Sequence, residues 1–221
     1  MKKDKIKVCE IFKSIIGEGK YQGYPALFVR VSGCTRSCDW CDTKYHSEGK
    51  IYSVDELSAV ISAKLGLSVL DIVVFTGGEV LLYKSQIFKA ITKVEEVLLS
   101  YSTKFFAETN GDLIKTGYQA ADLFLFFDYI CVSPKDVKVA KRVSKLFDNY
   151  PRDRYDIKVV TDLEKVGVDL IPYATMLQPL TTYNKKRDLK IKQRVWEYCV
   201  QHGLFYSGRL HVEVWGKKKG V

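Results

Sequence analysis

The sequence has few cysteines, no proline- or glycine-rich linker and no long apolar run. Six cysteines in 221 residues are too few for a disulfide-stabilised secreted scaffold. The opening MKKDKIKVCEIFKS lacks the apolar core of a secretory signal. No stretch approaches the roughly 20 apolar residues of a membrane span. We therefore expect a single cytoplasmic domain over residues 1–221, with reduced cysteines and no membrane partner.

Basic charge, by contrast, is in excess, with a formal net charge of +9. Such a balance suits nucleic acid or an anionic small molecule. The basic residues are scattered, however, and the only tight run is GKKKG at residues 216–220. A solvated segment is the simpler interpretation of that run. We therefore expect no nucleic-acid partner.

Apolar runs typical of strands alternate with amphipathic runs typical of helices. We expect strands at residues 26–32, 71–76, 104–109, 128–133, 155–161, 175–180 and 209–215. We expect helices at residues 53–66, 85–101, 136–149 and 189–203. Ser53 with Glu56 three residues later is a capping-box signature at the start of the first helix. The order predicts an α/β fold with a parallel sheet, as a partial, open β/α barrel of about six strand–helix units rather than a doubly wound sheet.

Short polar or glycine-containing motifs lie at the carboxyl ends of five of these strands. They are the cysteine loop at 33–50, TGGE at 76–79, ETNG at 108–111, SPK at 133–135 and QPL at 178–180. The carboxyl ends of parallel strands lie at one edge of a sheet, where ligands bind. We therefore expect one site assembled from most of the chain.

The cysteine loop carries Cys34, Cys38 and Cys41 with the spacing C-x3-C-x2-C. Thiolates suit zinc or an iron–sulfur cluster. A structural zinc site needs four ligands, and His46 is a candidate for the fourth. Alternatively, three thiolates on a [4Fe-4S] cubane leave one iron open to a substrate or cofactor.

The spacing resembles the signature of the radical S-adenosylmethionine (SAM) superfamily. FKSIIGEGKYQGYPALFVRVSGC, followed by CDWCDT, TGGE, ETNG, SPK and LQPL, resembles the 7-carboxy-7-deazaguanine synthase family over nearly the whole chain. That family converts 6-carboxy-5,6,7,8-tetrahydropterin to 7-carboxy-7-deazaguanine and ammonia, in deazapurine (queuosine) biosynthesis. A 5′-deoxyadenosyl radical removes a hydrogen and the ring contracts. The resemblance implies a lyase with a [4Fe-4S] cluster, S-adenosylmethionine and Mg2+, a reductant such as flavodoxin or ferredoxin, and a homodimer.

The resemblance also implies roles for individual residues. Cys34, Cys38 and Cys41 would hold the cluster, and Thr43 would bind Mg2+. The cofactor contacts would be Trp40, Cys41, Asp42, Gly77, Gly78, Glu79, Ser133, Pro134, Lys135 and Gln178. The substrate contacts would be Ile15, Ile16, Gly17, Glu18, Arg30, Thr76 and Glu108. Arg30 suits the pterin carboxylate because a guanidinium binds carboxylates through two hydrogen bonds.

The chain departs from the family pattern at three places. IGEG replaces QGEG, so Ile16 stands where an amide is usual; Val80 replaces the proline of TGGEP; and the segment HVEVWGKKKGV differs from the family's QTHK. Two other functions stay open on the residues alone. One is an activase that generates a glycyl radical on a partner protein, and the other is a zinc-stabilised RNA-binding module.

Overall fold

The computed structural model describes residues 4–38, 48–66, 71–98, 102–218 and 220. Within these ranges the strands are β1 (Lys5–Ile15), β2 (Pro25–Val31), β3 (Lys50–Ser53), β4 (Ile72–Gly77), β5 (Lys104–Thr109), β6 (Tyr129–Val132), β7 (Tyr155–Thr161), β8 (Met176–Pro179) and β9 (Phe205–Tyr206). The α-helices are α1 (Val54–Gly66), α2 (Lys84–Leu98), α3 (Gly117–Phe126), α4 (Val137–Phe147), α5 (Lys185–His202) and α6 (Leu210–Trp215). Two 3-10 helices are η1 (Val80–Tyr83) and η2 (Val168–Tyr173).

The described strands form one curved sheet in the order β3-β1-β2-β4-β5-β6-β7-β8-β9. From β2 onward every neighbouring pair is parallel, whereas β1 pairs antiparallel with both β2 and β3. The two edges, β3 and β9, do not pair, so the sheet stays open. The expected partial β/α barrel is confirmed.

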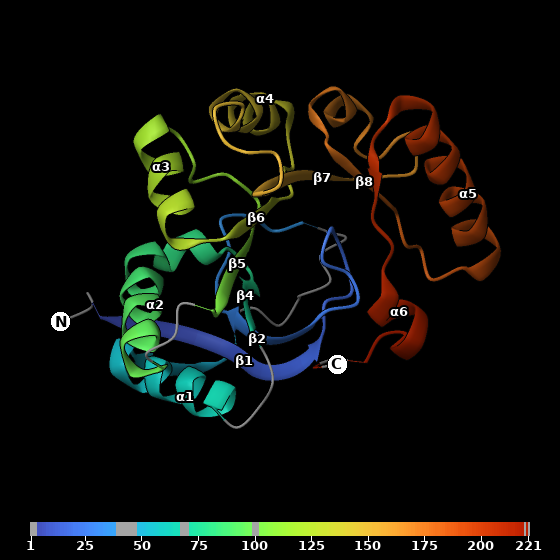
Figure 1. Ribbon diagram of the computed structural model, residues 1–221. Helices are drawn as coiled ribbons and strands as arrows, with labels where there is room; N and C mark the ends of the chain where they lie inside the picture. Colours follow the sequence, from blue (N-terminus) through green and yellow to red (C-terminus); the bar gives the residue numbers. More distant parts are fainter. Residues whose placement is uncertain (1–3, 39–47, 67–70, 99–101, 219, 221) are drawn as a thin grey trace.

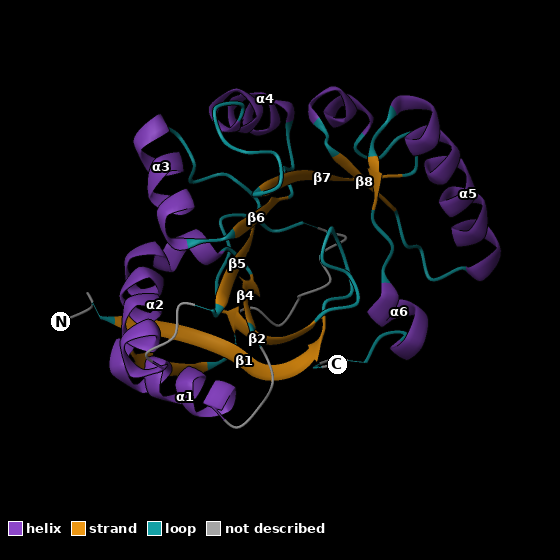
Figure 2. Cartoon of the chain, viewed as in Figure 1, coloured by secondary structure: helices purple, strands orange, loops and turns teal. Residues whose placement is uncertain are grey.

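Two layers make up the fold, with the strands inside and α1 to α5 outside (Figures 1 and 2). The main core lies between these layers and includes the fully buried Phe75, Phe105 and Phe127. A smaller apolar cluster on the inner side of the sheet contains Ile16, Phe106 and other residues. The helices cover one face of the sheet with apolar side chains. The polar motifs therefore lie at the carboxyl ends of the strands.

The helix boundaries follow local capping chemistry. Ser53 and Glu56 form the expected capping box, since Glu56 N donates to Ser53 Oγ and Ser53 N donates to Glu56 Oε2. Asp136 caps α4 by accepting from Val139 N. Gly203 ends α5 with a φ of 66°, which suits a residue without a Cβ.

The expected strand at 209–215 is wrong. Residues 205–206 occupy the sheet edge beside β8, and residues 210–215 form the helix α6. Because no strand is available to pair with it, this segment forms hydrogen bonds between its own backbone groups, such as the one from Glu213 N to Arg209 O. Helix α3 and the antiparallel strands β1 and β3 are further elements that were not expected from the sequence.

The segment that contains α6 crosses the open side of the sheet (Figure 1). Leu210 N donates to Gly17 O, and Gly19 N donates to Ser207 Oγ, each at 2.8 Å. The segment from β9 to the start of α6 thus contacts the turn between β1 and β2. Among the described residues, no helix has the length and apolar character that a membrane crossing requires.

Candidate active site

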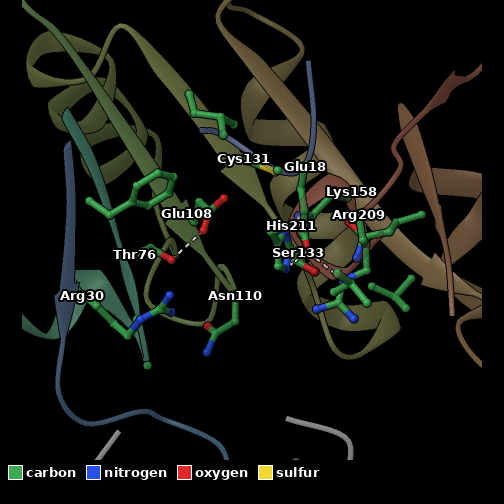
Figure 3. A pocket seen from close by; sticks show the side chains of 18 of the residues that line it. Glu18, Arg30, Thr76, Glu108, Asn110, Cys131, Ser133, Lys158, Arg209 and His211 are labelled. Atoms are coloured by element: carbon green, nitrogen blue, oxygen red, sulfur yellow. Dashed lines mark hydrogen bonds and ion pairs between the residues drawn. The ribbon is translucent and has the colours of Figure 1, made fainter. Parts of the chain in front are cut away.

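A cavity of about 340 Å³ opens at the carboxyl ends of the parallel strands. Its wall comes from β1, β2 and β4 to β8, from the loops that follow several of these strands, and from the segment around α6. Figure 3 shows Arg30, Thr76 and Glu108 on one side of the cavity, and Glu18, Lys158, Arg209 and His211 on the other. The predicted site residues on the wall are Ile15, Ile16, Gly17, Glu18, Arg30, Cys34, Cys38, Thr76, Gly77, Gly78, Glu108, Ser133, Lys135 and Gln178.

The cysteine loop begins directly at the end of β2, beside the Gly77–Gly78 turn that follows β4. Glu79 N donates to Gly33 O at 2.8 Å. A Cβ on Gly78 would lie 1.7 Å from the same carbonyl oxygen, so only glycine permits this approach. Cys34 and Cys38 both line the cavity, and Cys34 N lies 3.2 Å from the Cβ position of Gly78. Two thiols from one loop on an open cavity fit a cluster that also binds a ligand.

Arg30 and a Thr76–Glu108 pair form one side of the cavity (Figure 3). Arg30 Nε donates to Glu10 Oε2 at 3.1 Å, and its guanidinium lies 5.7 Å from the centroid of the Phe12 ring. Thr76 Oγ1 donates to Glu108 Oε2 at 2.5 Å. The cation and the carboxylate are therefore both fixed by neighbours before any ligand binds.

The opposite side carries the Glu18 cluster, which consists of Glu18, Lys158, Arg209 and His211. Lys158 Nζ donates to Glu18 Oε2, and Arg209 Nε donates to Glu18 Oε1 at 2.9 Å. His211 Nε2 lies 3.9 Å from the latter oxygen. Only 8% of the Lys158 side chain and 19% of the Glu18 side chain are exposed. The cluster thus joins the β1–β2 turn to β7 and to the segment before α6.

The charges of this cluster reinforce one another. Burial alone would raise the pKa of Glu18, but Lys158 and Arg209 outweigh burial and hold that pKa well below its ordinary range. Burial alone would lower the pKa of Lys158, but Glu18 holds it above its ordinary value. Glu18 and Lys158 therefore both stay ionised throughout the neutral pH range.

The SPK motif lies between these two sides. Lys135 Nζ donates to Ser133 Oγ at 2.9 Å, and both residues line the cavity. Burial, together with the charge of Lys158, lowers the pKa of Lys135. Gln178 follows on β8, where its Oε1 accepts from Ser207 Oγ at 3.3 Å.

Of the predicted cofactor contacts within the described residues, Pro134 and Glu79 do not reach the cavity wall. Pro134 lies outside it, and the fully buried carboxylate of Glu79 is engaged within the protein. Glu79 Oε1 accepts from Leu81 N and Thr109 Oγ1, and Oε2 accepts from Asn110 N. Glu79 thus ties the end of β4 to the end of β5, and any contact with a cofactor stays a prediction.

Ile16 lies at the boundary between the cavity and the inner apolar cluster. Its side chain is 6% exposed and packs in the same cluster as Val74 and Phe106. An apolar side chain therefore fits its surroundings at the position where the family usually has an amide. The candidates Trp40, Cys41, Asp42, Thr43 and His46 lie outside the described residues.

Several residues on the cavity wall were missed by the sequence analysis. They are Arg36, Asn110, Cys131, Lys158, Arg209, His211, Lys217 and Lys218. Lys158 had a visible signal, because a lysine interrupts the apolar strand YDIKVV. Asn110 stands inside the ETNG motif. Arg209 and His211 were hidden by the wrong strand assignment.

Cys131 gives a direct test of burial at the floor of this cavity. Burial is the main cause that raises the pKa of its thiol to about 12. We expect Cys131 to resist alkylation in the folded apoprotein at about pH 8.5, where an ordinary thiol reacts as the thiolate. Mass spectrometry after iodoacetamide treatment measures this, with urea-unfolded protein as the control. Rapid labelling of Cys131 in the folded protein would contradict the structure.

Comparison with known proteins places this site in a family. The model of the Radical SAM superfamily matches residues 28–171. A protein of Hyperthermus butylicus named 7-carboxy-7-deazaguanine synthase is 32% identical over 95% of this chain and 92% of its own. One of Thermoplasma acidophilum with the same name is 37% identical over 71% of this chain and 72% of its own. One of Pyrobaculum aerophilum, also so named, is 29% identical over 98% and 97%.

The fold has solved counterparts. The crystal structure of QueE from Escherichia coli matches with a TM-score of 0.55 and 19% identity, covering 94% of this chain and 95% of that chain. The structure of anSMEcpe with bound AdoMet and a peptide matches with a TM-score of 0.57 and 19% identity, covering 85% and 64%. The relatives described here favour neither the activase nor the RNA-binding module. The chain belongs to the 7-carboxy-7-deazaguanine synthase family of the radical SAM superfamily.

Proposed function

We propose that this protein converts 6-carboxy-5,6,7,8-tetrahydropterin to 7-carboxy-7-deazaguanine, with release of ammonia. One observation carries the proposal. A single cavity presents a held arginine and a held carboxylate on one side, and two cysteines of the C-x3-C-x2-C loop next to them. Such a cavity suits a small, polar, anionic ring compound that must lie next to a redox group.

The substrate residues divide by chemistry. Arg30 binds the pterin carboxylate, with Glu10 holding the guanidinium in place. Glu108 accepts from ring N–H groups of the pterin, and the hydrogen bond from Thr76 orients its carboxylate. Backbone groups of residues 15–18 complete the substrate side. The Glu18 cluster holds this turn against β7.

Cys34 and Cys38, with Cys41, hold the [4Fe-4S] cluster. When bound, the cluster would supply the electron for reductive cleavage of S-adenosylmethionine. The Gly77–Gly78 backbone, Ser133, Lys135 and Gln178 bind the rest of S-adenosylmethionine at the same edge. Thr43 binds Mg2+ through its hydroxyl oxygen, a hard ligand suited to a hard cation.

Product formation tests the proposal. The protein is reconstituted anaerobically with iron and sulfide and is then incubated with the carboxytetrahydropterin, S-adenosylmethionine, Mg2+ and dithionite. We expect 7-carboxy-7-deazaguanine and ammonia in equal amounts. Cleavage of S-adenosylmethionine without this product would reject the substrate. A zinc-containing protein without sulfide would reject the whole proposal.

Arg30→Lys should reduce kcat/KM for the carboxytetrahydropterin. A lysine keeps the positive charge but loses the two-pronged geometry, and a hydrogen bond between charged groups contributes roughly 1.5–3 kcal/mol, or about 10- to 100-fold. Steady-state kinetics measure the change. The matched control is Arg187→Lys at an exposed position on α5, which should leave kcat/KM unchanged. An equal kcat/KM for both variants would show that Arg30 does not bind the substrate.

The proposal also covers the protein's surroundings. It includes a cytoplasmic location, a homodimer, and flavodoxin or ferredoxin as the reductant. A reducing compartment supports cluster thiolates, because oxidising conditions convert free thiols to disulfides. Light scattering of the reconstituted protein tests the dimer, and replacement of dithionite by each reduced donor tests the reductant.

A further inference from the structure

The stretch between the first two cluster cysteines is held from outside the loop. Arg36 lies between Cys34 and Cys38, and its guanidinium binds the carboxylate of Asp112 in a two-pronged manner. Nε donates to Oδ2 at 2.7 Å and Nη2 donates to Oδ1 at 2.5 Å. Nη2 also donates to Asp136 Oδ2. We call Arg36, Asp112 and Asp136 the Arg36 network.

The two carboxylates of this network are themselves fixed. Asp136 caps α4, with Oδ1 accepting from Val139 N at 2.9 Å. Asp112 N donates to Asn110 Oδ1 at 2.9 Å. The partners of Arg36 are 76 and 100 residues away along the chain, so the loop is held against two separate elements. A bidentate guanidinium that binds two carboxylates is held in one orientation more firmly than an isolated surface ion pair.

A second residue of α4 holds the loop that carries Asp112. Arg142 donates to three backbone carbonyl oxygens, those of Ile114 at 2.8 Å and of Gly111 and Asp112 at 3.4 Å. The loop between β5 and α3 is therefore a fixed support, and not a free carboxylate that moves to meet Arg36.

The support reaches the cluster ligand itself. Asn110 Nδ2 donates to Thr35 Oγ1 at 2.9 Å and lies 3.8 Å from Cys34 Sγ. Thr35 Oγ1 in turn donates to Asp112 Oδ2 at 2.7 Å. Asp112 thus connects to both residues that follow Cys34, and its neighbour Asn110 contacts the sulfur.

We propose that Asp112 and Asp136, acting through Arg36, are positioning residues that hold the stretch from Cys34 to Cys38 in its cluster-binding conformation. The proposal rests on the proposed function, because it assumes that Cys34 and Cys38 bind the cluster. Groups that orient metal ligands without touching the metal commonly change metal affinity by about 10- to 100-fold. The Arg36 network would act in this way on the first two cluster thiolates.

Asp136→Asn is the sharpest test, since asparagine also caps helices well while it removes the charge that faces Arg36. Asp112→Asn and Arg36→Gln complete the set. The matched control is Asp122→Asn, which removes the ion pair between Asp122 on α3 and Lys84 at the start of α2. Each variant is reconstituted anaerobically with iron and sulfide. Bound iron and sulfide, the electron paramagnetic resonance (EPR) spectrum of the reduced cluster, and the rate of cluster loss to a chelator are then measured.

We expect Asp112→Asn and Arg36→Gln to lose the cluster about tenfold faster than wild type, and Asp136→Asn to lose it several-fold faster, with unchanged circular dichroism. Combining Asp112→Asn with Arg36→Gln should add little to either change, because both act through the same contact. Additive effects, or loss rates equal to that of Asp122→Asn, would overturn the proposal.

These measurements need no pterin, so the two proposals fail separately. A wild-type cluster that is retained but yields no carboxydeazaguanine would reject the proposed substrate and leave the inference intact. Full product formation together with normal cluster retention in all three variants would reject the inference alone.

Discussion

Gly78→Ala should produce a protein that fails to retain its cluster. The added Cβ would lie 1.7 Å from Gly33 O and 2.5 Å from Gly33 C, which are backbone atoms at the start of the cysteine loop. No side-chain rotation relieves such a clash, so β2 or β4 must shift. We expect a loss of about 3 kcal/mol in the free energy of unfolding, the upper part of the range for overpacking. We also expect most of the iron and sulfide to be lost.

Gly117→Ala is the matched control for that experiment. Gly117 lies at the start of α3, and a Cβ there would meet nothing within 4 Å. Alanine in a helix is more stable than glycine by about 0.5–1 kcal/mol, so this variant should be as stable as wild type or more so. Urea unfolding and chemical iron analysis measure both variants. Normal iron content in Gly78→Ala would mean that the turn and the loop do not approach so closely.

Glu18→Gln should destabilise the protein by about 3 kcal/mol, because it leaves two largely buried cations without their counter-charge. Lys158 and Arg209 both donate to this carboxylate, and 8% and 10% of their side chains are exposed. In the double variant Glu18→Gln/Lys158→Met, the Lys158 cation that would be left without a counter-charge is also removed. We expect the double variant to be more stable than Glu18→Gln alone.

The pH dependence of this effect has a definite sign. Burial alone would raise the pKa of Glu18, but the two cations lower it from its ordinary 4.5. A lowered pKa contributes stability that is present above the unfolded-state pKa and is lost as pH falls through the folded-state value. The advantage of wild type over Glu18→Gln should therefore stay constant from about pH 5 to 8 and shrink below about pH 4.5. A growing advantage toward acid pH would contradict this assignment.

Much of the site followed from the sequence because parallel strands bring their carboxyl ends to one edge. TGGE, ETNG, SPK and QPL were each expected after a strand, and each contributes at least one residue to the cavity wall. The capping box of α1 was equally local, since Ser53 and Glu56 are three residues apart. Both kinds of pattern depend on residues that are close together in the sequence. They can therefore be predicted without knowing the tertiary contacts.

The parts that were missed depend on distant partners. The alternation in RLHVEVW is compatible with a strand, but β9 already occupies the sheet edge there, and the segment forms α6. The sequence around Lys158 does not indicate that Glu18 is its ion-pair partner, because the two residues are 140 positions apart. Arg36 was not predicted for the same reason, since its partners Asp112 and Asp136 follow β5 and β6, 76 and 100 residues further along the chain.

The bridge between Glu18 and Arg209 has a consequence for synthesis of the chain. The two residues are 191 positions apart, so the contact closes one of the longest loops in the molecule. Domains can begin to fold as they emerge from the ribosome, and contacts between distant residues form late. The turn after β1 is translated first and can pair with Lys158 of β7, but it acquires its second cation only when residue 209 has left the exit tunnel. A nascent chain halted before that point would carry the cysteines and all strands up to β9, yet lack one wall of its binding cavity.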